Sequence, residues 1–131
     1  DLKVKVIEKL KNEGHQIKDF GPYNAESCDY PDYVHPLAKA VESGEFTYGV
    51  VICGSGNGVN MVANKYQGIR SGLCWEPSLA EMTRLHNDAN ILALGSRLTD
   101  EVEVYSIIDI FLNTNFEGGR HQERINKIET K

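Results

Sequence analysis

The sequence has few cysteines and no long apolar run. Its three cysteines, Cys28, Cys53 and Cys74, lie far apart and form no C-x-x-C pair. The pattern therefore favours neither a disulfide framework nor a zinc ribbon, and it is typical of the reducing cytosol. Because no apolar run approaches the roughly 20 residues that cross a bilayer, we also expect a soluble cytoplasmic protein without membrane contacts.

Positive charge is also scarce. The chain has 14 Lys and Arg residues against 19 Asp and Glu residues, for a net charge of −5. This balance argues against a nucleic-acid partner, which normally requires a basic domain or face. The negative net charge does not exclude small anionic ligands, because a few Lys or Arg side chains at one site can bind an anion whatever the net charge of the chain. The length of 131 residues, 40% of them hydrophobic, predicts one domain with one core.

Helical and strand-like apolar patterns alternate along the chain. Helices are predicted over residues 2–12, 31–43, 77–86 and 100–113, with another from the glycine loop at 54–58 to about 66 and a C-terminal one from about 119. Strands are predicted over 15–20, 48–53, 69–74 and 90–95. This alternation predicts an α/β fold, a single three-layer doubly wound (Rossmann-like) domain over 1–131 with a parallel sheet.

Ligands of such sheets bind beyond the carboxyl ends of the strands, which directs attention to the loops. Cys53 ends the most apolar strand and is followed by Gly54-Ser55-Gly56-Asn57-Gly58. Alternate glycines let backbone N–H groups approach a ligand, and the next helix adds its positive end, so the loop predicts an anion site. The dinucleotide fingerprint needs glycine where Val59 stands, and no Lys-Ser/Thr follows as in a P-loop, which argues against NAD and ATP.

The thiol of Cys53 has two interpretations. Near a helix N-terminus its thiolate is stabilised, so it can act as a nucleophile or a base. A lone cysteine at the end of an apolar strand is, alternatively, a buried core residue. The adjacent glycine loop favours the reactive interpretation. Cys28 and Cys74 lack such a loop and are predicted to be structural.

Three further loops carry polar or charged candidates. His86 can transfer protons near neutral pH and Asn87 can donate and accept hydrogen bonds, although a helix C-cap is the alternative. Arg97 follows a strand end, where a merely exposed arginine is the alternative. Arg120 and Arg124 share a helix face and can grip one phosphate, unless they belong to a solvated basic tail. Together with Cys53, these groups suit proton transfer alpha to a carbonyl on a phosphorylated substrate.

At these loops the sequence resembles the B-type ribose-5-phosphate isomerase family, which includes the related galactose-6-phosphate and allose-6-phosphate isomerases. The matching segments cover essentially the whole chain in order. They are Asp29-Tyr30-Pro31, Ile52-Cys53-Gly54-Ser55-Gly56-Asn57-Gly58, Ala63-Asn64-Lys65, Gly68-Ile69-Arg70, His86-Asn87-Asp88-Ala89-Asn90, Gly95-Ser96-Arg97 and Glu117-Gly118-Gly119-Arg120-His121.

The resemblance implies an aldose–ketose isomerase of the pentose phosphate pathway that uses no metal and no other cofactor. By this analogy Cys53 moves the proton from C2 to C1 of ribose 5-phosphate through a cis-enediolate, and Ser55 helps move protons between O1 and O2. His86 opens the furanose ring. The implied substrate-binding residues are Gly54, Gly56, Asn57, Gly58, Asn87, Arg97, Arg120 and Arg124.

The resemblance also implies a homodimer with active sites shared between subunits, which can pair into a tetramer. Family members have a five-stranded sheet, for which we expect the order 2-1-3-4-5. They begin with a strand ending in Asp-His-Ala/Val-Gly, whose carboxylate and imidazole help bind substrate, and no residue of this numbering matches it. We expect about 12 further residues before Asp1, which would form this strand and a loop. Without that strand, we expect the two strands beside it to be unpaired along the shared edges.

Other functions compete with this interpretation. Within the family, a six-carbon sugar-phosphate isomerase is the alternative, and His86 favours the five-carbon or allose enzymes over the galactose type. A non-catalytic sugar-phosphate-binding protein would need the arginines but no base, so Cys53 and Ser55 argue against it. A thiol-based redox or acyl-transfer enzyme would need a resolving cysteine or a neighbouring base, and neither is evident in the sequence.

Overall fold

The chain alternates helices with strands, as seen in a computed structural model that describes residues 1–23 and 28–129. The helices are α1 (Leu2–Asn12), α2 (Pro31–Glu42), α3 (Asn57–Ala63), α4 (Pro77–Asn87), α5 (Glu101–Asn113) and α6 (Arg120–Asn126). Local chemistry explains several boundaries. Pro31 and Pro77 begin α2 and α4, where a missing N–H costs nothing. The carboxylates of Asp1 and Asp100 accept backbone N–H groups at the starts of α1 and α5.

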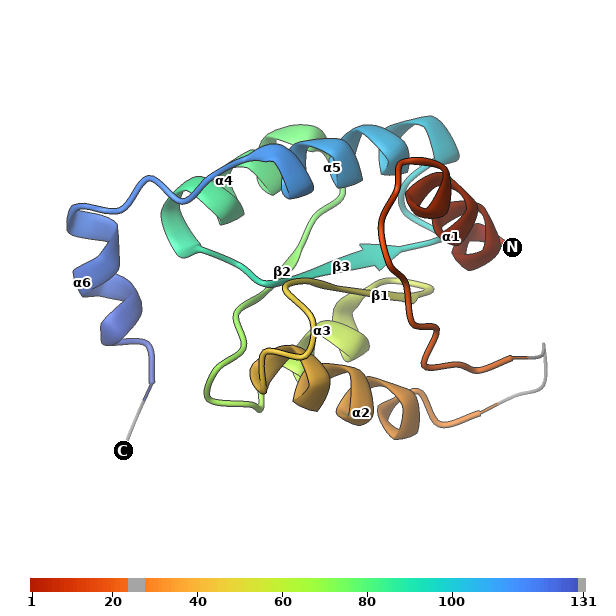
Figure 1. The fold of residues 1–131 in the computed structure, drawn as a ribbon, viewed down its shortest axis with the longest axis horizontal. Coiled ribbons are helices and arrows are strands. Elements are labelled where there is room, and N and C mark those ends of the chain that lie inside the picture. The colour runs from red at the N-terminus through yellow and green to blue at the C-terminus, as the bar shows by residue number, and fades with distance from the viewer. Residues whose placement is uncertain (24–27, 130–131) are drawn as a thin grey trace.

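A parallel sheet forms the middle layer of the molecule (Figure 1). Its strands are β1 (Gly49–Cys53), β2 (Ser71–Leu73) and β3 (Ile91–Gly95), in the order β1-β3-β2. The expected order 2-1-3-4-5 places the strand over 90–95 at the edge of the sheet. That expectation was wrong, because β3 lies between β1 and β2. Every residue of β3 is buried, whereas β1 and β2 contain partly exposed positions. A continuously apolar strand is most stable when helices cover both of its faces and neighbouring strands pair with both of its edges. This explains why β3 is the central strand.

Residues 15–20, predicted as a strand, are not one. The segment has no strand pairing, and β1 pairs only with β3 among the residues that the structure describes. Alternating polarity by itself does not make a strand without a ladder partner. A groove of about 870 Å³ lies against this segment, α1 and β1, and it reaches Cys53. Within the described residues, one edge of β1 therefore has no strand partner.

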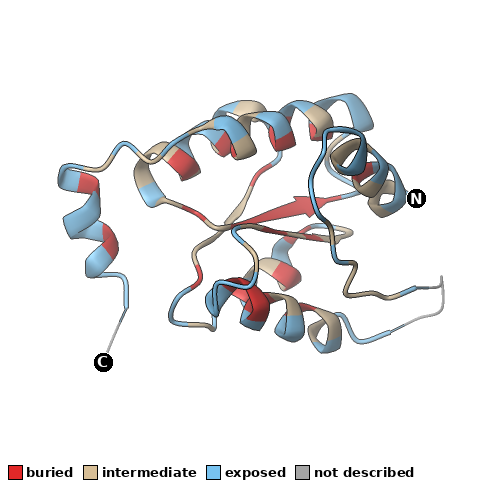
Figure 2. Ribbon diagram, viewed as in Figure 1, coloured by how far each residue is buried: buried red, intermediate tan, exposed pale blue. Residues whose placement is uncertain are grey.

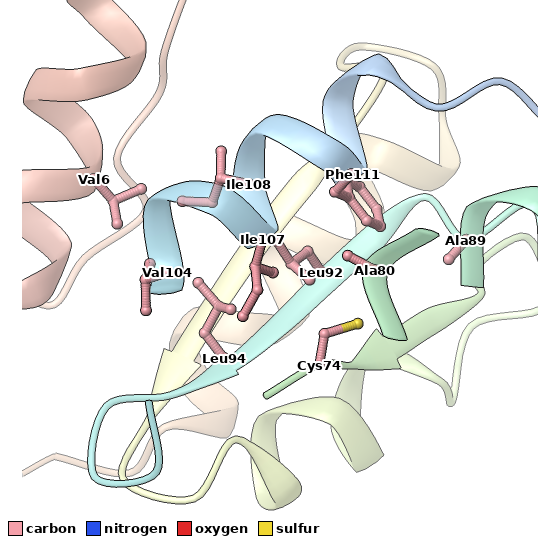
Figure 3. Packing of buried hydrophobic residues seen from close by; sticks show 10 residues of the cluster. All are labelled: Val6, Cys74, Ala80, Ala89, Leu92, Leu94, Val104, Ile107, Ile108 and Phe111. Atoms are coloured by element: carbon pink, nitrogen blue, oxygen red, sulfur yellow. The ribbon is translucent and has the colours of Figure 1, made fainter. Parts of the chain in front are cut away.

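Helices cover both faces of the sheet. On one face, α1, α4 and α5 pack around Leu92, Leu94 and Phe111 (Figures 2 and 3). On the other, α2 and α3 pack against Ile91 and Ala93. Alternate residues of β3 thus enter opposite layers, as the period of two in a strand requires. The predicted three-layer doubly wound architecture is confirmed. Within the described residues, no helix combines the length and apolarity that a membrane span needs.

Two predicted elements are shorter in the structure. The helix expected to reach about residue 66 ends at Ala63, and the strand expected over 69–74 covers only Ser71–Leu73. Asn64 accounts for both boundaries. Its side-chain amide donates to the carbonyl of Ser71 at 3.0 Å and accepts from the N–H of Ser71 at 2.8 Å. These bonds tie the end of α3 to the start of β2.

Candidate active site

The glycine loop after β1 surrounds the thiol of Cys53. The N–H of Gly56 donates to Cys53 Sγ at 3.1 Å, and the N–H of Asn57 donates to Ser55 Oγ at 3.2 Å. Gly56 has a φ of +78°, and a Cβ there would lie 2.9 Å from the carbonyl carbon of Leu94. Glycine at 56 therefore allows the turn that aims an N–H at the sulfur. The thiol is half-buried and Ser55 is exposed.

Arg97 lies against this loop. A Cβ on Gly54 would be 3.3 Å from both Cδ and Nε of Arg97, so the glycine makes room for that side chain. The backbone joins the two loops, because the N–H of Ser96 donates to the carbonyl of Cys53 at 2.8 Å and that of Arg97 to Gly54 at 2.9 Å. The structure thus brings together the thiol cluster, defined as Cys53, Gly54, Ser55, Gly56, Asn57, Gly58 and Arg97.

Tyr30 is a member of this surface that the sequence reasoning missed. Its ring and hydroxyl lie so close to Gly58 that a Cβ at that position would collide with them. The hydroxyl can donate to a ligand held at the glycine loop. The segment Asp29-Tyr30-Pro31 is part of the family resemblance, but the spacing of residues in the chain assigns no role to the tyrosine.

A second group of candidates lies where α4 ends. His86 is in its last turn, half-buried, and Asn87 is its exposed final residue. The rings of His86 and His121 stack with centroids 4.4 Å apart and planes 15° apart. Helix α6, which begins one residue before His121, carries the exposed Arg120 and Arg124. We call His86, Asn87, Arg120 and Arg124 the histidine cluster.

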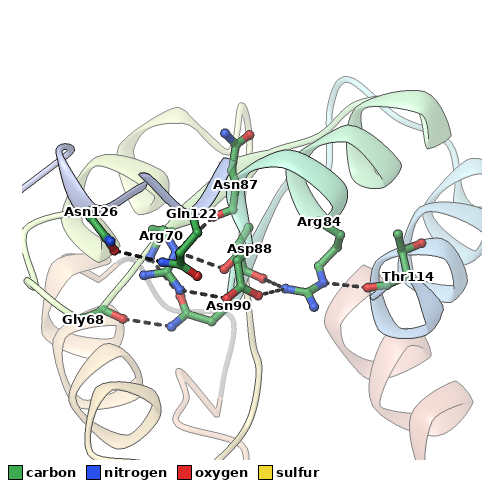
Figure 4. Close-up of polar contacts among 10 residues, drawn as sticks. Gly68, Arg70, Arg84, Asn87, Asp88, Asn90, Thr114, Gln122 and Asn126 are labelled. Atoms are coloured by element: carbon green, nitrogen blue, oxygen red, sulfur yellow. Dashed lines mark hydrogen bonds and ion pairs between the residues drawn. The ribbon is translucent and has the colours of Figure 1, made fainter. Parts of the chain in front are cut away.

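Arg84 holds the end of α4 in place, and the sequence reasoning missed it. Its buried guanidinium donates to Asp88 Oδ1 at 2.9 Å and to the carbonyls of Ala89 at 2.7 Å and Thr114 at 3.0 Å (Figure 4). Asp88, at a φ of +48°, ends the helix. Arg70 adds bonds to the carbonyls of Asn87 and Asp88. In sequence Arg84 resembles any surface arginine of a helix, so no local signal distinguishes it.

We expect Arg84→Met to lower the free energy of unfolding by about 2–4 kcal/mol, measured by urea denaturation. The methionine keeps much of the packing volume but leaves the two carbonyls and Asp88 Oδ1 without the donor Arg84, while Arg70 still lies 3.5 Å from Asp88 Oδ2. The expected loss of stability lies toward the lower part of the range for buried ion pairs, because the side chain of Asp88 is 37% exposed. Lys11→Met, at an exposed position of α1, is the control and should stay within about 0.5 kcal/mol. An equally small change for Arg84→Met would contradict its structural role.

The two clusters lie at opposite ends of the sheet. Cys53 is paired with Gly95 at the carboxyl ends of β1 and β3. His86 and Asn87 precede the amino end of β3 at Ile91, and α6 lies beyond that end (Figure 1). The five residues of β3 alone extend about 16 Å. One chain therefore does not assemble all four candidate loops into a single site, contrary to the simple expectation that they share the carboxyl edge.

The other two cysteines differ from each other. Cys74 is fully buried in the core beside Ala80, as predicted for a structural cysteine. Burial raises the pKa of its thiol to about 12, so it stays protonated at neutral pH. Cys28 is exposed, so it fills no place in the core. Of the three cysteines, all within the described residues, Cys53 is the one whose thiol accepts a hydrogen bond from the glycine loop.

Comparison with known proteins yields a consistent result. Residues 1–128 match the family model described as Ribose/Galactose Isomerase. Ribose-5-phosphate isomerase B of Escherichia coli is 42% identical over 97% of this chain and 85% of that protein. The structure of ribose-5-phosphate isomerase B from Clostridium thermocellum is 46% identical with a TM-score of 0.96, covering 97% of this chain and 86% of that one. That of Mycoplasma genitalium with bound ribulose-5-phosphate is 41% identical with a TM-score of 0.93, covering 97% and 85%.

Proposed function

The chain belongs to the ribose/galactose isomerase family and is an isomerase, and from that premise we propose that it interconverts ribose 5-phosphate and ribulose 5-phosphate. The observation that carries the proposal is the thiol of Cys53, which accepts a hydrogen bond from the N–H of Gly56 at 3.1 Å. The side chain of Arg97 lies against the next residue, Gly54. A base and backbone donors are what proton transfer next to a carbonyl requires, and the cation suits the phosphate of the substrate.

The proposed reaction moves one proton between adjacent carbons. The Cys53 thiolate takes the proton from C2 of the open-chain aldose, and the C2–H electron pair forms the C1–C2 double bond of a cis-enediolate. The negative charge moves to O1. Cys53 then returns the proton to C1, while the hydroxyl of Ser55 moves a proton from O2 to O1, so that the carbonyl forms at C2. No electrons leave the sugar, and the reaction is an internal oxidation and reduction.

Backbone donors stabilise the charge that appears on the enediolate oxygens. The N–H groups of Gly54 and Gly56 belong to the loop that borders Cys53, and those of Asn57 and Gly58 to the first turn of α3. Such donors act where charge develops in the transition state. In the structure the N–H of Gly56 bonds Cys53 Sγ and that of Asn57 bonds Ser55 Oγ, so these two donors turn to the sugar oxygens when the substrate binds. The positive φ of Gly56 supports this assignment.

We further propose that a second copy of the chain completes the site. In a two-fold dimer the thiol cluster of one subunit faces the histidine cluster of the other, which gives two equivalent sites. The partner copy would supply His86 to open the furanose ring and Asn87 to hold a sugar hydroxyl. Arg120 and Arg124 of that copy would join Arg97 at the phosphate. The separation of the two clusters along β3 supports this arrangement, and two such dimers can form a tetramer.

The state of the cysteines supports the proposal that the protein is located in the cytoplasm. Cys28, Cys53 and Cys74 are all free thiols in the structure, and the proposed base at Cys53 works only as a reduced thiol. A reducing compartment maintains that state. The proposed substrate is a phosphorylated sugar, and no nucleic acid or membrane partner is part of the proposal.

A comparison of three substrates tests the assignment. We expect kcat/KM for ribose 5-phosphate to exceed those for allose 6-phosphate and galactose 6-phosphate by at least about tenfold. The extra carbon moves the phosphate away from the arginines when C1 and C2 stay at Cys53. A coupled assay with purified protein measures the three values. A preference for either hexose would reassign the chain to the six-carbon alternative, and binding without turnover would indicate a sugar-phosphate-binding protein.

A further inference from the structure

Three ligand-type side chains meet at the junction of α4 and α6. His86, Glu117 and His121 each offer one atom, and the three atoms lie within 4.8 Å of one another. His121 Nε2 is 3.5 Å from Glu117 Oε1. We propose that these residues, the His–Glu–His group, bind a divalent transition-metal ion, with Zn²⁺ as the expected ligand. The ion is an inhibitor at this site and no part of the isomerisation.

Two segments of the chain position the His–Glu–His group, the end of α4 and the loop that leads into α6. His86 comes from the last turn of α4, and the N–H of Glu117 donates to the carbonyl of Leu85 at 3.0 Å, so the loop before α6 is attached to the same turn. Gly118 and Gly119 have φ values of +76° and +59°. These positive angles reverse the chain between Glu117 and His121 and bring both side chains to one place.

The spacing of the atoms suits a small cation. With metal–ligand bonds of about 2.0–2.2 Å, tetrahedral coordination places neighbouring ligand atoms about 3.3–3.6 Å apart. The pair formed by Glu117 and His121 already has this separation. The stacked rings require a rotation of His86, which is half-buried, so that its nitrogen turns toward the same point. Glu117 is exposed and adjusts more freely, whereas buried His121 is the fixed member.

The chemistry of the group selects the kind of ion. Two imidazoles and one carboxylate suit zinc and other borderline divalent metals, and they do not suit magnesium or calcium, which prefer oxygen ligands. The carboxylate of Glu117 and the carboxyl end of the 11-residue helix α4 favour a cation. Arg120 and Arg124, on the same helix as His121, oppose it and limit the affinity.

One consequence rests on the proposed function. If His86 opens the sugar ring, a metal on its nitrogen occupies the lone pair that accepts or passes the proton. The ion would also lie beside the phosphate-binding arginines of α6. Zn²⁺ is therefore expected to compete with the sugar phosphate, raising the apparent KM and leaving kcat unchanged at saturating substrate.

Cobalt(II) titration of the intact protein tests the site directly. We expect one Co²⁺ per chain, with visible d–d absorption and without the near-ultraviolet charge-transfer band of a cobalt thiolate. Glu117→Gln and His121→Ala each remove a direct ligand, so each should weaken binding by at least the about 10–100-fold that loss of an outer hydrogen-bond partner costs. His35→Ala, at an exposed histidine that bonds Tyr66, is the matched control and should bind like the parent. Cys53→Ala should also retain the ion, which separates this site from the reactive thiol.

The outcomes distinguish this proposal from the isomerase assignment. Cobalt binding that survives Glu117→Gln and His121→Ala, or that disappears in Cys53→Ala, would overturn the metal site. Because Glu117 is exposed, its variant tests the idea even if the buried His121→Ala chain does not fold. Isomerase activity without metal binding overturns the metal site alone, whereas metal binding without isomerase activity leaves it standing and overturns the proposed function.

Discussion

Replacing Cys53 with alanine is expected to lower kcat for ribose 5-phosphate by about 10²–10⁴-fold, the usual contribution of a general base. The variant lacks an acceptor for the C2 proton, while Ser55 and the arginines remain. Substrate binding should therefore change little, since the phosphate is held by guanidinium groups rather than by sulfur. Steady-state kinetics with ribose 5-phosphate, together with calorimetric binding of the same sugar phosphate, measures both effects.

The matched control for this variant is Cys28→Ala. It removes an exposed thiol that lines the same groove as Cys53 but is separated from the glycine loop in sequence, and its kcat should equal that of the parent protein. Circular dichroism of both variants checks that the fold is retained. An unchanged rate for Cys53→Ala would remove that residue from the role of base. A covalent adduct on Cys53, detected by intact mass during turnover, would instead indicate the thiol-based transfer enzyme considered from the sequence.

Mixing two inactive variants is expected to restore about one quarter of the parent activity, because random pairing makes half of the dimers mixed and each mixed dimer has one intact site. The variants are Cys53→Ala and His86→Ala. The first retains an intact histidine cluster and the second an intact thiol cluster. Since the two clusters lie at opposite ends of β3, a complete site can form only where they meet across two subunits.

A mixture of Cys53→Ala with Ser55→Ala is the control for complementation. Both changes affect the thiol cluster, so no mixed dimer contains an intact pair of clusters, and activity should remain at the level of the separate variants. Subunits are exchanged by mild denaturation and refolding, and the oligomer is measured by analytical ultracentrifugation. A monomeric active enzyme, or mixed dimers that remain inactive, would rule out shared sites.

Most elements could be predicted from local patterns. Helical spacing, together with the prolines that begin α2 and α4, placed these helices within one or two residues. The glycine loop and Cys53 were found because alternate glycines after an apolar strand have a local chemical meaning. The segment 15–20 shows where this fails. Its alternating pattern is that of a strand, but strand formation also needs hydrogen bonds from a neighbour.

The contacts of Arg84, His121 and Tyr30 were beyond prediction from the sequence. Arg84 is buried because Ala89 and Thr114 direct their carbonyls at it, and no local spacing indicates that. His121 meets His86 across 35 positions of the chain, and Tyr30 meets Gly58 across 28. Each of these pairs depends on how whole helices and loops pack, which the hydrophobic pattern constrains only loosely.

By itself, the sequence determined the α/β class, every helix and strand except the one predicted over 15–20, and the loop that gives Cys53 its backbone donors. These properties depend on short stretches of chain, where periodicity, proline and glycine act through local geometry. Tertiary structure alone decided that β3 lies between β1 and β2, and that Cys53 and His86 lie at opposite ends of the sheet. Those outcomes depend on which apolar faces are buried together and which backbone edges are paired, and such choices involve residues far apart in the sequence.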